Sequence, residues 1–172
     1  SQPRLSVQLH WASRGLQAVT QGISSTEWLN RCPAELRPGV QAILLTALRH
    51  WGLGRALRQL LVPKAPAPAV DALLTLGLTL LAQAEPMYTE HTLVSQTVEA
   101  AKKDTRHRAL SSLINACLRR FTRERQALLE TVQQQSVVRY NHPEWWIQQL
   151  RTDHPQAWER ILSQALRRPP LV

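Results

Sequence analysis

The sequence has few of the residues from which catalytic and metal sites are usually built. Its only two cysteines, Cys32 and Cys117, form no CxxC pair, which argues against a zinc ribbon and against a disulfide framework. No GxGxxG or P-loop pattern is present, so no nucleotide-binding loop is predicted. The six histidines are scattered and no two carboxylates share an evident face, so no general acid–base pair is predicted. Catalysis and metal binding are therefore not expected from this chain alone.

Acidic residues and long apolar runs are also scarce. Twelve Asp and Glu face 21 Lys and Arg, which gives a net charge of +9 and predicts a polyanionic partner, nucleic acid more readily than a membrane surface. The longest apolar stretch, Ala69–Ala84, is short for a membrane span and contains Asp71, so it is expected to be a buried core helix. The N-terminus does not resemble a signal peptide, and a reducing cytoplasmic location fits the cysteine content.

The apolar residues that are present follow a helical period. Hydrophobic residues make up 44% of the chain and recur at a spacing of 3.6 with no alternating strand pattern, which predicts an all-α protein of about seven to nine helices. Ser24–Glu27 reads as a capping box, and Pro38 as the first turn of a further helix. Gly52 and Gly54 are expected to weaken or kink that helix.

The second half of the chain gives the clearest helical patterns. Residues 70–84 are apolar nearly all round, which predicts the central helix of a bundle. Residues 110–121 carry an apolar stripe along one face, and the polar residues Gln133–Ser136 are expected to end the helical region. Two short helices should follow, with Pro143 and Pro155 in their first turns and residues 141 and 153 as caps.

Positive charge is concentrated between residues 102 and 125, where only Asp104 and Glu124 oppose it. Cations on one face attract phosphate and release counterions, so this region is the candidate RNA-binding site. The alternative is a solvated face whose arginines complement helix C-termini. Phe121 lies on the apolar stripe and the tryptophans lie in packing patterns, so recognition of phosphate and RNA shape is favoured over base stacking. The predicted site consists of Lys102, Lys103, Arg106, Arg108, Arg119, Arg120 and Arg123.

A second basic stretch contains no acid between Glu35 and Asp71. Sequence alone leaves open whether it joins the first cluster in space. Its members are Arg37, Arg49, Arg55, Arg58 and Lys64.

Five segments, in this order, resemble a known family: Asp71–Leu81, His91–Ala100, Leu113–Arg120, Arg139–Trp146 and Arg167–Pro170. The first three resemble the NusB-type helical domain. That domain is shared by the transcription antitermination factor and by the N-terminal part of bacterial ribosomal RNA small-subunit cytosine-5 methyltransferases, called Sun, Fmu or RsmB. The last two segments resemble the methyltransferase branch, which continues in this pattern where the antitermination factor ends.

The resemblance implies a NusB-type bundle with two or three extra C-terminal helices that lead to a catalytic domain absent from this chain. Residues 1–136 would form the RNA-binding domain, and residues 137–172 an extension or linker. This fragment would not be an enzyme by itself. S-adenosylmethionine and the cysteine nucleophile would belong to the absent domain, since the family nucleophile follows a proline whereas Cys32 precedes one.

The same resemblance implies ribosomal RNA and the chain's own methyltransferase domain as partners, with no membrane and no metal. Trp145, Trp146 and Trp158 are the candidates for packing between domains. The arginine-rich helix start that is linked to RNA binding in the antitermination factor is reduced here to Arg4 and Arg14, and no site is placed there. The target nucleotide and the oligomeric state stay open.

Two other functions are compatible with the residues. A free-standing NusB-like antitermination factor would bind RNA and a ribosomal protein. A helical protein-interaction module would bind a partner through its tryptophan-rich C-terminal helices, and its basic charge would be incidental.

Overall fold

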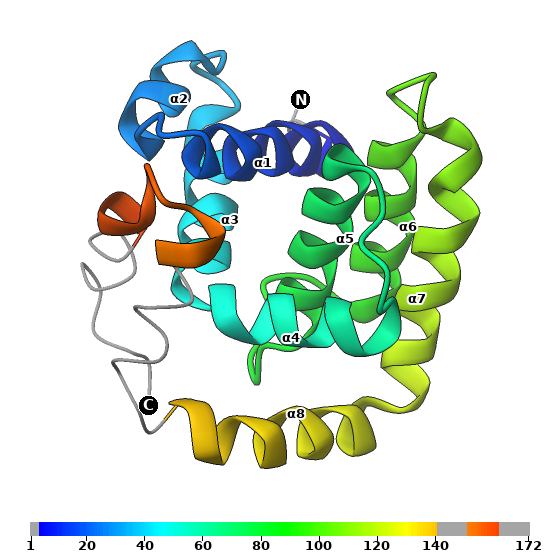
Figure 1. Ribbon diagram of the computed structural model, residues 1–172. Helices are drawn as coiled ribbons and strands as arrows, with labels where there is room; N and C mark the ends of the chain where they lie inside the picture. Colours follow the sequence, from blue (N-terminus) through cyan, green and yellow to red (C-terminus); the bar gives the residue numbers. More distant parts are fainter. Residues whose placement is uncertain (1–3, 141–150, 162–172) are drawn as a thin grey trace.

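A computed structural model describes residues 4–140 and 151–161 (Figure 1). Residues 4–140 contain eight α-helices and one 3₁₀ helix, residues 151–153 and 158–161 are also helical, and the described residues contain no strand, which confirms the all-α prediction. The elements are α1 Leu5–Thr20, α2 Ser25–Arg31, α3 Arg37–Arg49, α4 Trp51–Leu61, α5 Pro68–Leu81, α6 Glu90–Ala101, η1 Arg108–Leu110, α7 Ser111–Arg123 and α8 Arg125–Tyr140.

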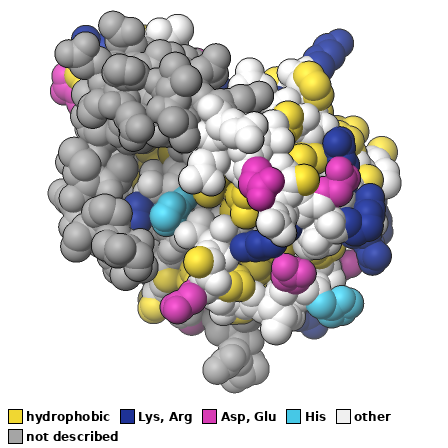
Figure 2. All heavy atoms as spheres, turned by 90° about the horizontal axis from the view of Figure 1, so that it is seen from below, with side chains coloured by type: hydrophobic (Ala, Val, Ile, Leu, Met, Phe, Trp, Pro, Cys, Tyr) yellow, Lys and Arg dark blue, Asp and Glu magenta, His cyan; other side chains and the backbone are white. Residues whose placement is uncertain are grey.

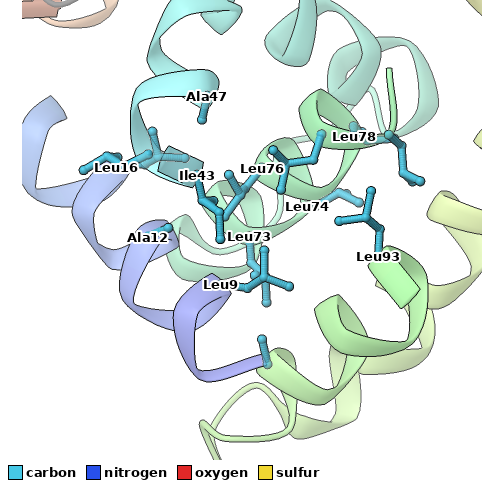
Figure 3. Close-up of a cluster of buried hydrophobic side chains, with 14 of the residues drawn as sticks. Leu9, Ala12, Leu16, Ile43, Ala47, Leu73, Leu74, Leu76, Leu78 and Leu93 are labelled. Carbon is cyan, nitrogen blue, oxygen red and sulfur yellow. The ribbon is translucent and has the colours of Figure 1, made fainter. Parts of the chain in front are cut away.

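Helix α5 is the centre of the bundle, as its apolar sequence predicts. It contacts α1, α3, α4, α6 and α7, and every residue from Leu73 to Leu81 is buried. Leu74, Leu76 and Leu78 have no exposed surface and meet side chains of α1, α3 and α6 in the core (Figure 3). A helix surrounded on all sides needs no polar face, which is why this segment departs from the usual amphipathic pattern.

The helix starts follow their capping residues. The Ser24 hydroxyl accepts a hydrogen bond from the backbone N–H of Glu27 at 3.1 Å, which confirms the predicted cap of α2. Thr89 caps α6 in the same way, accepting from the N–H of Thr92 at 3.2 Å. Pro38 and Pro68 lie in the first turns of α3 and α5, where the missing N–H costs no helical hydrogen bond.

The helix that was expected to weaken or kink at Gly52 and Gly54 is interrupted at a different residue. Helix α3 ends at Arg49 and α4 begins at Trp51, so the chain turns at His50 and not at the glycines. Gly54 instead allows α4 to approach α5, because a Cβ there would lie 2.0 Å from the Thr79 hydroxyl oxygen. The two helices are in contact along this face.

Two further boundaries differ from expectation. Helix α8 continues through Gln133–Ser136 to Tyr140, so the polar residues do not end it. Residues 151–153 and 158–161 are helical, separated by His154 and a turn at 155–157, and the carbonyl of His154 accepts a hydrogen bond from the N–H of Trp158 at 2.9 Å. The caps and prolines expected at residues 141 and 143 lie outside the described residues.

Candidate nucleic-acid interface

The loop between α6 and η1 presents the first part of the predicted site. Asp104 organises this loop: one carboxylate oxygen accepts the backbone N–H of Arg106 at 3.0 Å, and both oxygens accept from the Arg106 guanidinium at 3.4 Å. These side-chain and backbone hydrogen bonds from Arg106 lower the pKa of Asp104. The loop therefore keeps one ionised carboxylate in its interior, and its other charged side chains point outward.

Three of the predicted cations have a carboxylate partner on their own element. Lys102 Nζ lies 3.3 Å from Glu99, Arg106 lies 3.4 Å from Asp104, and Arg120 Nε lies 3.0 Å from Glu124. Most of these side chains are well exposed, so each pair contributes about 1 kcal/mol or less to stability. Such pairs leave the cation reachable but cancel much of its charge.

The other four predicted cations have no carboxylate partner among the described residues. Lys103, Arg108 and Arg123 are exposed, and so is Arg119, whose Nε donates to the Asn115 amide oxygen at 3.1 Å. An amide oxygen holds the guanidinium in place without cancelling its charge. These four side chains carry the uncompensated positive charge of the predicted site.

The seven cations form two groups at opposite ends of α7. The loop residues lie beside the N-terminus of α7, while Arg119, Arg120 and Arg123 lie in its last turns (Figure 1). The rise of an α-helix places Ser111, the first residue of α7, and Arg119 roughly 12 Å apart along the axis. Lys and Arg side chains gather at the right edge of the view from below, the side on which α7 lies (Figure 2). We refer to the seven residues as the α7 edge.

Two residues that the sequence does not assign to the site lie near the α7 edge. His10 and Arg14 of α1 line a small cavity together with Asp104 and His107. Burial, followed by the charges of Arg14 and Lys103, lowers the pKa of His10, while Asp104 opposes this shift. The i, i+4 spacing of His10 and Arg14 was the available signal, because it places both on one helix face.

Three of the five cations in the second basic stretch, Arg37, Arg55 and Arg58, are engaged within the fold. Arg37 donates to the carbonyls of Leu29 and Cys32 at 2.9 and 3.1 Å and so caps α2. Arg58 is 5% exposed and its Nε lies 2.8 Å from Asp71.

Two other arginines are also engaged within the fold. Arg55, from the same stretch, lies 3.6 Å from Asp153. Arg125 donates to the carbonyls of Leu81 and Gln83 at the end of α5, and is therefore structural as well.

Among the side chains whose exposure is described, those of residues 4–134 and 151–161, no Phe, Trp or Tyr is exposed, and Met87 is the one exposed large hydrophobic side chain. Trp158 is half-buried against the core, and the Arg151 guanidinium lies 4.3 Å from the centre of its ring. Trp145 and Trp146 lie outside the described residues. Within residues 4–134 and 151–161, the α7 edge therefore has exposed charge but no exposed Phe, Trp or Tyr side chain on which a base could stack.

The cysteines are buried, and burial raises the pKa of both thiols, so neither is an activated nucleophile. Within residues 4–140 and 151–161, no three His, Cys, Asp or Glu side chains are placed to hold a metal ion. None of the helices in that part is long and apolar enough to cross a membrane.

Comparison with known proteins identifies a family. Residues 142–172 match the family model described as "Methyltr_RsmF/B-like, ferredoxin-like domain". Ribosomal RNA small subunit methyltransferase B of Pseudomonas putida is 33% identical over 183 aligned residues, which cover 99% of this chain and 39% of that protein. A probable ribosomal RNA small subunit methyltransferase B of Coxiella burnetii is 41% identical over 82 residues, 48% of this chain and 19% of that protein.

The methyltransferase B of Citrobacter koseri is 37% identical over 81 residues, 47% of this chain and 18% of that protein. The chain therefore spans about two fifths or less of the length of these relatives. The match along the whole chain and the matched C-terminal segment confirm the family predicted from the sequence, that of the ribosomal RNA small subunit methyltransferase B proteins.

Proposed function

We propose that this chain is the RNA-contacting helical part of an S-adenosylmethionine-dependent ribosomal RNA cytosine-5 methyltransferase. Its bundle, of NusB type, would position small-subunit ribosomal RNA for a catalytic domain that carries the cofactor and the cysteine nucleophile. The single observation that supports this most is the α7 edge, where four exposed cations have no carboxylate partner among the described residues. The relatives' names supply the RNA and the reaction class.

Phosphate contacts are the mode of recognition that fits this edge. Lys103 and Arg108 at one end of α7, and Arg119 and Arg123 at the other, could meet phosphates spaced along one RNA strand or across one groove. With no exposed Phe, Trp or Tyr side chain in residues 4–134 and 151–161, the bundle would read backbone shape and leave the choice of base to the catalytic domain.

Residues 142–172 would belong to a second unit. A ferredoxin-like domain is built from strands as well as helices, so the family match favours the start of such a domain over a simple linker. The predicted boundary at residue 136 would then lie slightly too early. Packing of Trp145 and Trp146 between domains, and a cytoplasmic location, stay predictions.

The test is RNA binding by this chain and by two double variants. Lys103→Ala with Arg108→Ala removes the unpaired charges at one end of α7, and Arg119→Ala with Arg123→Ala removes those at the other. We expect each double variant to bind small-subunit ribosomal RNA about tenfold or more weakly at moderate salt. Fluorescence anisotropy with labelled RNA fragments measures this.

Arg31→Ala with Arg49→Ala is the control for the change in net charge. It removes two positive charges from α2 and the end of α3, across the bundle from α7 (Figure 1). Equal losses in the control and the test variants would make the binding a matter of net charge and contradict a defined edge. Absence of RNA binding by the unmodified chain would favour a helical protein-interaction module instead.

A further inference from the structure

The segment 151–161 packs on the bundle at a specific place on α4. Ala157 and Ile161 are 1% and 0% exposed and belong to the hydrophobic core. The ring of His154 meets the ring of Trp51 edge-on, with centroids 5.2 Å apart and an interplanar angle of 73°. This segment therefore shares a core with the helical bundle.

Polar contacts fix the register of this packing. Arg55, one turn after Trp51 on α4, lies 3.6 Å from the carboxylate of Asp153. His154 is 8% exposed and forms part of the wall of a cavity of about 260 Å³ that is also lined by Arg55 and Asp71. Apolar contacts alone would tolerate sliding, whereas an ion pair and an edge-on ring contact set one orientation.

The position of segment 151–161 in the sequence indicates which part of the protein makes this contact. Residues 151–161 fall inside the range 142–172 that matches the ferredoxin-like domain family. On the proposed division of the chain, they are residues of the following unit that are docked on the helical bundle. In Figure 1 this segment (orange to red) lies on the opposite side of the bundle from α6 and α7.

We propose that Trp51 and Arg55 of α4 form a docking surface for the first part of the downstream ferredoxin-like unit, and that this surface fixes the orientation of the α7 edge relative to that unit. The docking contact stands on the bundle's own geometry. Its consequence for RNA rests on the proposed function. The bundle then acts as a rigid spacer, with RNA at one side and the rest of the protein held at the other.

Electron spin resonance distance measurements test the docking directly. Nitroxide labels on Ala116→Cys of α7 and Glu159→Cys of the docked segment report the separation of the two sides, because both positions are exposed. The native cysteines are buried and the pKa of each thiol is raised, so they react slowly with the label. The otherwise unmodified chain should give one narrow distance distribution.

Exchanging the charges of Arg55 and Asp153 tests whether their ion pair contributes to docking. Arg55→Asp places two carboxylates face to face and should raise the undocked population about tenfold, seen as a second, broader distance component. Asp153→Arg should do the same, and the variant with both changes should regain the narrow distribution. If a charge-reversal variant does not fold, the milder Arg55→Ala variant replaces it. Circular dichroism checks the helix content of every variant.

Arg31→Asp is the control, because the Arg31–Glu27 pair at 3.3 Å is exposed and lies on α2. It should leave the distribution unchanged. An unchanged distribution in both single reversals, or no recovery in the exchanged pair, would overturn the docking surface. RNA binding by the same variants separates the two proposals: its loss in the Arg55 variants with docking intact would contradict the placement of RNA at the α7 edge and leave the docking surface standing.

Discussion

The two basic stretches look alike in sequence but have different roles in the folded chain. On the α7 edge, four of seven cations keep their charge uncompensated at the surface of the described structure. In the stretch from Arg37 to Lys64, three of five arginine and lysine side chains are engaged in caps and ion pairs. The difference comes from acids distant in sequence, since Asp71 and Asp153 reach α4 only through folding. Local charge density therefore cannot separate a ligand surface from structural arginines.

The largest expected effect is on stability, from the buried arginine of α4. Arg58→Ala leaves the Asp71 carboxylate, 18% exposed, without the partner that lies 2.8 Å away, and removes the hydrogen bond to the Val62 carbonyl at 2.9 Å. We expect the free energy of unfolding to fall by about 3 kcal/mol. Urea denaturation measures it. A loss no larger than that of Arg31→Ala, an exposed residue, would show that Arg58 is no more structural than a surface cation.

RNA affinity should separate the unpaired from the paired cations of the α7 edge. Replacing Lys103, Arg108, Arg119 or Arg123 singly by alanine should weaken RNA binding by about threefold or more, since each removes an uncompensated charge. Replacing Lys102, Arg106 or Arg120 should have a smaller effect, because each is already paired with a carboxylate. Titrations at fixed salt measure both sets. The reverse order would mean that RNA displaces the carboxylates.

Removing a carboxylate from the α7 edge should strengthen RNA binding, the opposite of the effect of removing a cation. Glu124→Gln releases Arg120, whose Nε lies 3.0 Å from the carboxylate, and should strengthen RNA binding by about twofold. Glu27→Gln, which releases Arg31 on α2, is the matched control and should leave RNA affinity unchanged. Parallel titrations of the two variants decide this. Equal gains in both would point to net charge and not to the α7 edge.

The smallest expected effect is a pH dependence of docking at α4. Burial, followed by the charge of Arg55, lowers the pKa of His154, and Asp153 opposes this shift; Asp71 and Arg55 line the same cavity. His154 is therefore neutral when docked, so docking should be strongest above the ordinary histidine pKa of about 6.5 and weaken as the pH falls below it.

Hydrogen exchange of the backbone amides of residues 156–161, corrected for intrinsic rates, should show this loss of protection between pH 7.5 and 5.5. His154→Gln cannot take up the proton and should exchange with little dependence on pH. The same pH dependence in that variant would assign the effect to another group.

Much of the fold follows from local sequence, because apolar period and capping are local properties. The burial of α5, the Ser24 cap and the stripe of α7 are all readable in this way. The turn at His50 is not, since no proline or glycine marks it and the packing of α4 on α5 determines it. The extension of α8 past Gln133 is missed for a similar reason: polar residues do not end a helix that contacts α4 and buries Leu128 and Val132.

The candidate site was predictable in composition but not in detail. Charge density located residues 102–123, but the pairing of Arg106 with Asp104 depends on how the loop folds. His10 and Arg14 join the site only because α1 packs beside the end of α6. Arg55 and Asp153 are nearly a hundred residues apart in the sequence, so their ion pair can be recognised only in the folded structure.

The most direct test of the account is the salt dependence of RNA binding by the variant in which Lys103, Arg108, Arg119 and Arg123 are all replaced by alanine. Four lost phosphate contacts should reduce the slope of log affinity against log salt concentration by about 3, at roughly 0.7 per contact on single-stranded RNA. The Arg31→Ala, Arg49→Ala control should keep the original slope. An unchanged slope in the fourfold variant would contradict the claim that the α7 edge is where this bundle meets RNA.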